Sequence, residues 1–143
     1  MHRELCLLII PLGLAICPAQ QPTAWQAPPA AKKMKNPVSL TGEKLEAIAK
    51  VYQERCASCH GEKGASNGPA AMALPADPAN FTDSKVMAKT TDGELFWKIG
   101  KGRAPMPGFE ADLSETSRWQ LVRYIRYLTG RSQYRYLGVK RAR

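Results

Sequence analysis

Cys56-Ala57-Ser58-Cys59-His60 is the stretch of the sequence that decides the fold. Two cysteines three residues apart, with a histidine directly after the second, form the attachment signature of a c-type haem. Each thiol can add to one vinyl group of a porphyrin, and the adjacent imidazole can bind the iron. His60 is the only histidine in the sequence beyond residue 2. The motif therefore predicts one covalent haem, attached at Cys56 and Cys59, with His60 as an iron ligand.

The N-terminal residues 1–19 are predicted to be a signal peptide. An apolar run at residues 5–17 follows Arg3 and is too short to span a bilayer. Cleavage is expected before Gln20, which makes the mature chain an exported, soluble, periplasmic protein. The alternatives are a lipoprotein acylated at Cys17 and an uncleaved N-terminal anchor.

Export decides which cysteines are available to a haem. Of the four cysteines, Cys6 and Cys17 leave with the signal, so that Cys56 and Cys59 stay in the mature chain. A redox-active disulfide of the thioredoxin kind is the alternative use of this pair. That alternative lacks the strand–helix setting of such a motif, and it leaves His60 without a role.

Positive charge lies at the two ends of the chain. The net charge is +9, yet residues 41–130 contain 12 Lys or Arg and 11 Asp or Glu. A nearly neutral domain with basic ends argues against a nucleic-acid-binding protein. The basic tail, residues 131–143, either makes a peripheral contact with anionic lipid or an acidic partner, or is a solvated extension.

The chain divides into a linker, a domain and the tail. Residues 20–40 are rich in Pro and Ala, lack apolar periodicity, and are predicted to be a disordered or semi-extended linker in which Trp25 is isolated. Residues 41–130 are the predicted domain.

Helical spacing of apolar residues predicts an all-α domain. No run shows the alternation of a strand. Residues 61–90 are irregular and contain several Gly and Pro, as expected if they pack against a large prosthetic group. A helix N-cap is expected at Thr41 and a left-handed C-cap at Gly130. The predicted helices span 42–56, about 70–73, about 83–88, 91–100 and 114–129.

A methionine is the expected second axial ligand of the iron. Met106 lies between two prolines, which stiffen the backbone and block helix formation. Met34 lies in the linker. Met72 and Met87 lie in short apolar segments, where methionine usually fills a core. Met106 is therefore the predicted ligand.

Taken together, the motifs resemble class I monohaem cytochrome c over residues 41–130. The resemblance is greatest to bacterial periplasmic members, including domains similar to the cytochrome c subunits of haem-copper oxidases. It implies a small domain of three to five helices wrapped around one covalent haem c. The residues that carry it are Tyr52, Cys56-x₂-Cys59-His60-Gly61, Asn67-Gly68-Pro69, Leu95-x₃-Ile99-x₂-Gly102, Met106-Pro107, Leu113-Ser114 and Leu121-Val122-x-Tyr124-Ile125.

The resemblance also implies roles for further residues. The first and last helices should cross with Tyr52 and Tyr124 packed at the crossing, where Ile48 replaces a glycine common in the family. The carbonyl of Pro69 should accept a hydrogen bond from the second ring nitrogen of His60. The candidates to stack near or pair with the haem propionates are Trp97, Lys98, Lys101 and Arg103, and the three cations among them would also surround the exposed haem edge.

The predicted function is one-electron transfer in a periplasmic respiratory or dehydrogenase-linked chain, and the protein is not expected to be an enzyme. Two axial ligands, His60 and Met106, would close the iron to substrate. The expected partners are a donor dehydrogenase or cytochrome bc-type complex and an acceptor oxidase or reductase, with the chain a monomer or a subunit of a larger complex. The alternatives, a peroxidase-like enzyme or a gas-binding sensor, require a labile sixth ligand.

Overall fold

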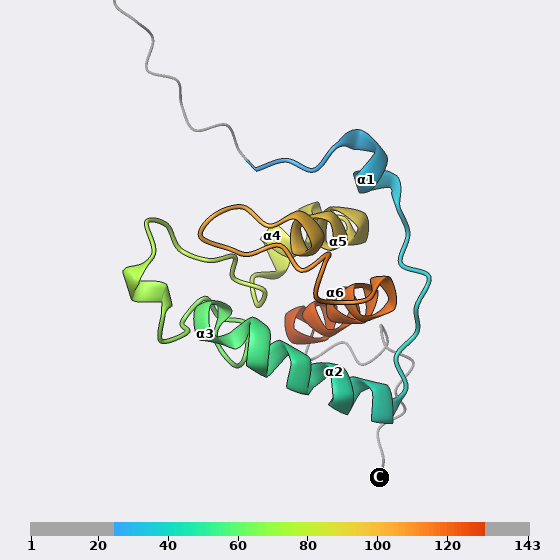
Figure 1. The fold of residues 1–143 in the computed structure, drawn as a ribbon, viewed down its shortest axis with the longest axis horizontal. Coiled ribbons are helices and arrows are strands. Elements are labelled where there is room, and N and C mark those ends of the chain that lie inside the picture. The colour runs from blue at the N-terminus through green and yellow to red at the C-terminus, as the bar shows by residue number, and fades with distance from the viewer. Residues whose placement is uncertain (1–24, 131–143) are drawn as a thin grey trace, which may run out of the picture.

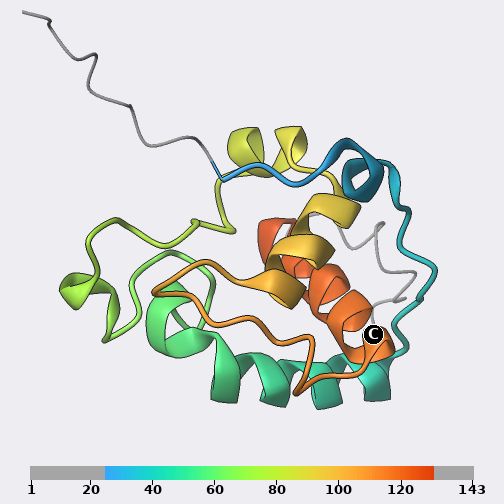
Figure 2. The same cartoon turned by 45° about the horizontal axis from the view of Figure 1, so that its top comes forward.

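The computed structural model describes residues 25–130, and that part of the chain is helical (Figures 1 and 2). The all-α prediction is confirmed, since the only β-type pairing between residues 25 and 130 is a single bridge, Arg103 with Met106. The helices are α1 (Pro29–Lys33), α2 (Gly42–Arg55), α3 (Ala57–His60), α4 (Ser84–Lys89), α5 (Asp92–Lys101) and α6 (Glu115–Thr129), with a 3₁₀ turn η1 (Ala71–Ala73).

Helices α2 and α6 pack against each other, although they begin and end the predicted domain. The rings of Tyr52 and Tyr124 meet with centroids 5.0 Å apart, as the family resemblance implied. Ile48 is only 2% exposed and belongs to the same core cluster as Leu121. A branched side chain thus fills the position where a glycine was expected in the family. The core lies between α2, α5 and α6.

The starts of three helices follow from local capping chemistry. The side chains of Asp83, Thr91 and Ser114 each accept a hydrogen bond from a backbone N–H in the first turn of the helix that follows. The predicted boundaries of these helices are therefore confirmed to within two residues. Thr41 precedes α2 without a side-chain cap bond. Gly130 has φ −114°, so the predicted left-handed cap is wrong.

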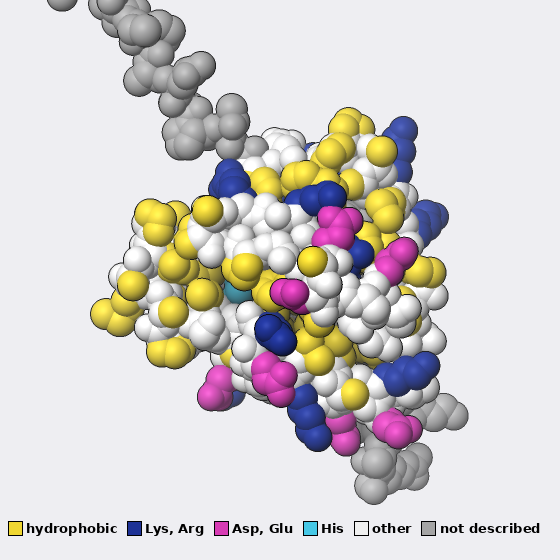
Figure 3. Space-filling model, in the orientation of Figure 1, with side chains coloured by type: hydrophobic (Ala, Val, Ile, Leu, Met, Phe, Trp, Pro, Cys, Tyr) yellow, Lys and Arg dark blue, Asp and Glu magenta, His cyan; other side chains and the backbone are white. Residues whose placement is uncertain are grey.

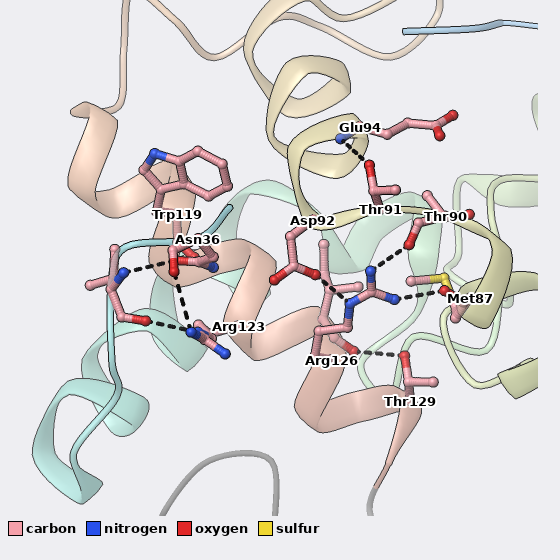
Figure 4. A network of polar contacts seen from close by, with 12 residues as sticks. Asn36, Met87, Thr90, Thr91, Asp92, Glu94, Trp119, Arg123, Arg126 and Thr129 are labelled. Atoms are coloured by element: carbon pink, nitrogen blue, oxygen red, sulfur yellow. Dashed lines mark hydrogen bonds and ion pairs between the residues drawn. The ribbon is translucent and has the colours of Figure 1, made fainter. Parts of the chain in front are cut away.

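Residues 25–40, here called the N-terminal strap, correct the linker prediction. They pass over α5, form α1, and descend to α2 along the right-hand edge of the molecule in Figure 1. The Asn36 amide donates to the Trp119 carbonyl at 2.9 Å, and the Arg123 guanidinium donates to the Val38 carbonyl at 2.7 Å (Figure 4). The sequence did not indicate this docking because the strap contributes an asparagine amide and a backbone carbonyl to the two contacts. Neither group produces apolar periodicity.

The long irregular segment after α3 forms the left side of the molecule in Figure 1. Met72 lies on η1 at 97% exposure, so the expectation that it fills the core is wrong. A three-residue turn within a loop offers no second element to cover a side chain. Met87 on α4 is 2% exposed and does fill the core, as predicted.

Among residues 25–130 there is no helix with the length and apolar character needed to span a bilayer. The predicted signal peptide, residues 20–24 of the predicted linker, and the basic tail lie outside the described residues.

Candidate functional site

The cysteines and the histidine lie together where α2 gives way to α3. Cys56 has φ −122° and ψ −35°, which separates the two helices, and Cys59 and His60 follow within α3. Both thiols are free and half-buried. Burial, helped by the neighbouring Cys59, raises the pKa of Cys56 to about 11. The Cys56 thiol is therefore protonated at neutral pH.

His60 is held in one tautomer and one ring plane. Its Nδ1 lies 3.0 Å from the carbonyl oxygen of Ala79, and because a carbonyl only accepts, Nδ1 carries the proton. The Phe81 ring stacks on the imidazole at 4.5 Å with an interplanar angle of 17°. Burial lowers the pKa of His60, partly opposed by the Ala79 hydrogen bond. The imidazole is thus neutral at pH 7, with the lone pair of Nε2 available to a metal.

The carbonyl that meets His60 corrects the prediction for Pro69. Pro69 lies between two residues whose backbone N–H groups bond to α3, Gly68 to the Cys59 carbonyl at 3.2 Å and Ala70 to the Ser58 carbonyl at 2.8 Å. These bonds tie the segment containing Pro69 to the α3 backbone, while Ala79 supplies the acceptor for Nδ1.

Ala79 reaches the imidazole because the segment around it is bonded back to the start of the loop. The Phe81 N–H donates to the Gly64 carbonyl at 2.7 Å, and the Ser66 hydroxyl donates to the Pro78 carbonyl at 2.6 Å. The two bonds flank Ala79 on either side. The position of the acceptor is therefore set by contacts that span 12 to 17 residues of sequence.

Met106 lies on the loop between α5 and α6, which we call the Met106 loop, residues 102–113. Its side chain is half-buried and packs against the core cluster. The base of the loop is closed by two backbone hydrogen bonds, from Phe109 to Ile99 at 2.9 Å and from Glu110 to Gly100 at 3.2 Å. In Figure 1 the loop extends from α5 toward the left side of the molecule, the side on which α3 also lies. The predicted thioether donor is thus carried by a loop that is closed at its base.

The face that holds these elements is largely apolar around its histidine. In Figure 3, in the orientation of Figure 1, a histidine is visible between hydrophobic side chains, with the long loop to its left. From Ala65 to Ala76 the loop carries no charged residue. An apolar surround of this kind suits a porphyrin.

The cations predicted to surround the haem edge are already engaged within the chain. Lys98 forms a salt bridge of 2.7 Å with the glutamate one turn earlier in α5. Lys101 bridges Glu110 at 2.5 Å, and its hydrogen bond and charge lower the pKa of that exposed carboxyl. Arg103 lies over the ring of Trp25, which also contacts Trp97. The positive charges of Lys98 and Lys101 are thus paired with carboxylates within the chain, which weakens their attraction for an acidic partner.

Sequence reasoning missed Ala79, Phe81 and the contacts of Trp25. Phe81 was visible only as a lone aromatic in an irregular segment, and Trp25 as a lone aromatic in a predicted linker. Arg118 was also missed: it is 9% exposed, and its guanidinium lies 4.6 Å from the centre of the Phe96 ring. No local pattern distinguishes such residues from surface side chains.

The donor set fits a c-type haem. Two free thiols occupy the first and fourth positions of a five-residue motif, and the fifth is an imidazole whose Nδ1 is hydrogen-bonded and whose Nε2 is not committed. A soft thioether lies on the Met106 loop. Thiols, imidazole and thioether are the groups that attach and ligate such a haem.

Comparison with known proteins places this arrangement in a family. No curated protein matches the sequence. A structure of the reducing HAO-like protein complex of Kuenenia stuttgartiensis contains a chain with TM-score 0.54 and 28% identity, covering 66% of this chain. The match spans 49%, about half, of that chain. The family model described as cytochrome C oxidase, cbb3-type, subunit III, matches residues 43–125. This protein is a haem-binding cytochrome c domain, and it belongs to the family of cytochrome c oxidase, cbb3-type, subunit III.

Proposed function

We propose that the chain is a one-electron carrier with a single haem c joined to Cys56 and Cys59 and ligated by His60 and Met106. The observation that carries the proposal is the geometry of His60. Its Nδ1 proton is committed to the Ala79 carbonyl at 3.0 Å, so the ligating nitrogen is Nε2, on the helix that also bears Cys59.

Bound haem iron supplies the one-electron ferric–ferrous couple. The chain sets how that couple behaves. The Ala79 carbonyl polarises the Nδ1 proton and makes Nε2 a stronger donor, while Phe81 restricts rotation of the ring. The Met106 thioether is soft, favours the ferrous state, and raises the reduction potential. With His60 and Met106 both bound, the iron would have no position for a substrate, which supports a carrier over an enzyme.

The setting we propose is the periplasm, after removal of residues 1–19. Family membership and the similarity to a chain of a multi-protein complex support protein partners. We infer a donor dehydrogenase or cytochrome bc-type complex on one side and a terminal oxidase or reductase on the other. In this setting the chain acts as a soluble carrier or as a subunit of one of these complexes.

The absorption spectrum of the ferric holoprotein tests the ligand set. His/Met ligation predicts low-spin iron with a weak sulfur-to-iron charge-transfer band. Met106→Ala should abolish the band and lower the reduction potential by roughly 0.1 V or more, within the range over which axial ligands tune haem. Met72→Ala is the matched control, because Met72 is 97% exposed and should leave the spectrum unchanged.

High-spin ferric iron in the unmodified holoprotein would instead favour the peroxidase-like or gas-sensing alternative. Loss of the band in Met72→Ala, with retention of the band in Met106→Ala, would show that Met72 on the long loop is the ligand instead of Met106.

A further inference from the structure

Trp25, at the start of the N-terminal strap, lies against two cations. The Lys98 ammonium is 5.4 Å and the Arg103 guanidinium 5.2 Å from the centre of its indole ring. The ring also tilts against Trp97, with centroids 6.3 Å apart. Both cations lie within the distance at which a ring attracts a positive charge through its electrons. Trp25 is thus bound to α5 and to the start of the Met106 loop at once.

Arg103 connects Trp25 to the predicted ligand. Its backbone N–H donates to the Met106 carbonyl at 3.0 Å, and its carbonyl accepts from the Met106 N–H at 2.9 Å. A residue bonded to Met106 in both directions cannot move without moving it. The side chain that limits the movement of Arg103 therefore also limits that of Met106.

The Met106 loop is folded tightly enough to move as a unit. Gly102 has φ +63°, and a Cβ placed there would lie 2.3 Å from the Gly108 nitrogen. The two ends of the turn around Met106 are thus in backbone contact. A restraint applied at Arg103 is accordingly transmitted to the whole turn.

The strap itself is anchored, so Trp25 is held in place. A Cβ at Gly93 would lie 1.9 Å from the Ala31 carbonyl oxygen, which shows that α1 rests directly on the α5 backbone. The hydrogen bonds of Asn36 and Arg123 fix the strap further along (Figure 4). Residues 25–40 precede the 43–125 span that the family model matches.

We propose that Trp25 is a positioning residue for the axial ligand: it holds Arg103, and through Arg103 keeps the Met106 loop closed. The inference rests on the proposed role of Met106 as a ligand. Without the indole, Arg103 loses its side-chain contact with the strap, and the loop opens more often. Each opening exposes the iron to a competing ligand from solvent.

Imidazole binding to the ferric holoprotein tests this proposal. The rate at which added imidazole removes the sulfur-to-iron band measures how often the loop opens. Trp25→Ala should raise that rate roughly 5- to 30-fold, the factor that corresponds to about 1–2 kcal/mol. Trp25→Phe keeps an aromatic face and should recover much of the restraint. Lys33→Ala, an exposed change within α1 of the same strap, should react as the unmodified protein does.

A second variant tests the strap without altering the indole. Gly93→Ala places a methyl group against the Ala31 carbonyl and should lift α1 from α5, with the same rise in imidazole binding. Alanine is the better helix former, so the rise is not explained by a weaker α5. If the Trp25→Ala protein does not accumulate, Gly93→Ala tests the proposal in its place.

The inference is wrong if Trp25→Ala binds imidazole at the unmodified rate while its far-UV circular dichroism is native. A missing sulfur-to-iron band in the unmodified holoprotein overturns the ligand assignment instead, so the two failures are distinguishable.

Discussion

At the scale of single residues, the site depends on close approach between the long loop and α3. Gly68 lies so near this helix that a Cβ would be 2.2 Å from the Ser58 carbonyl oxygen and 2.5 Å from that of Ala57. These atoms belong to backbone and cannot rotate away. The contact keeps the loop against the helix of the haem motif, and the same loop then delivers Ala79 to His60.

Gly68→Ala should therefore destabilise the fold, by about 2 kcal/mol or more, because relief of the clash requires the loop to leave α3. Gly42→Ala is the matched control: nothing lies within 4 Å of its Cβ position, and alanine favours the first turn of α2. We expect it to range from neutral to about 1 kcal/mol more stable. Urea unfolding of both proteins measures the difference, and equal stabilities would contradict the close approach.

At the scale of secondary-structure elements, Arg126 of α6 joins α4 to α5. Its guanidinium donates to the Met87 carbonyl at 2.7 Å, to the Thr90 carbonyl at 2.5 Å, and to the Asp92 carboxylate at 2.8 Å (Figure 4). One side chain thus satisfies carbonyls near the end of α4 and an acid in the first turn of α5. The planar fork of arginine can do this, whereas a lysine ammonium lacks its geometry.

Arg126→Ala should lower the free energy of unfolding by about 3 kcal/mol, because it leaves the largely buried Asp92 without its ion pair and two carbonyls without their donor. Arg123→Ala, one turn earlier on the same helix, removes bonds to strap carbonyls but leaves no carboxylate without an ion-pair partner. It should lower the free energy of unfolding by about 1 kcal/mol. Chemical denaturation compares the two variants. Equal losses of stability in the two variants would show that the ion pair between Arg126 and Asp92 contributes little to the free energy of unfolding.

At the scale of the whole molecule, the crossing of α2 and α6 joins the two ends of the domain. Ile48, Tyr52 and Leu121 are each 2% exposed or less, and the Tyr52 hydroxyl donates to the Gly61 carbonyl at 2.9 Å. That bond reaches from the crossing to the residue directly after His60. Core and haem site are therefore expected to unfold together.

Ile48→Ala should lower the free energy of unfolding by about 2–5 kcal/mol, because it leaves a cavity at the crossing. The thermal transitions seen by far-UV circular dichroism and by haem absorption should shift together. Val51→Ala, at a half-buried position of the same helix, is the control and should cost less. Two separated transitions would argue against a single cooperative unit.

The features that the sequence alone determined are local ones. The spacing of Cys56, Cys59 and His60 is the signature of a c-type haem, and the helix starts after Asp83 and Thr91 follow from side chains that bond to N–H groups two or three residues away. Apolar periodicity over 10 to 15 residues was sufficient for α2, α5 and α6. The family resemblance added the Tyr52–Tyr124 contact.

Only the tertiary structure decided which groups meet across longer distances. The acceptor for His60 is Ala79 instead of Pro69, because contacts through Gly64 and Ser66 set the path of the loop. The strap is docked because Gly93 allows the backbone of α1 to lie on α5. Backbone-to-backbone contacts of this kind depend on where the chain runs in space, and they leave no periodic pattern in the sequence.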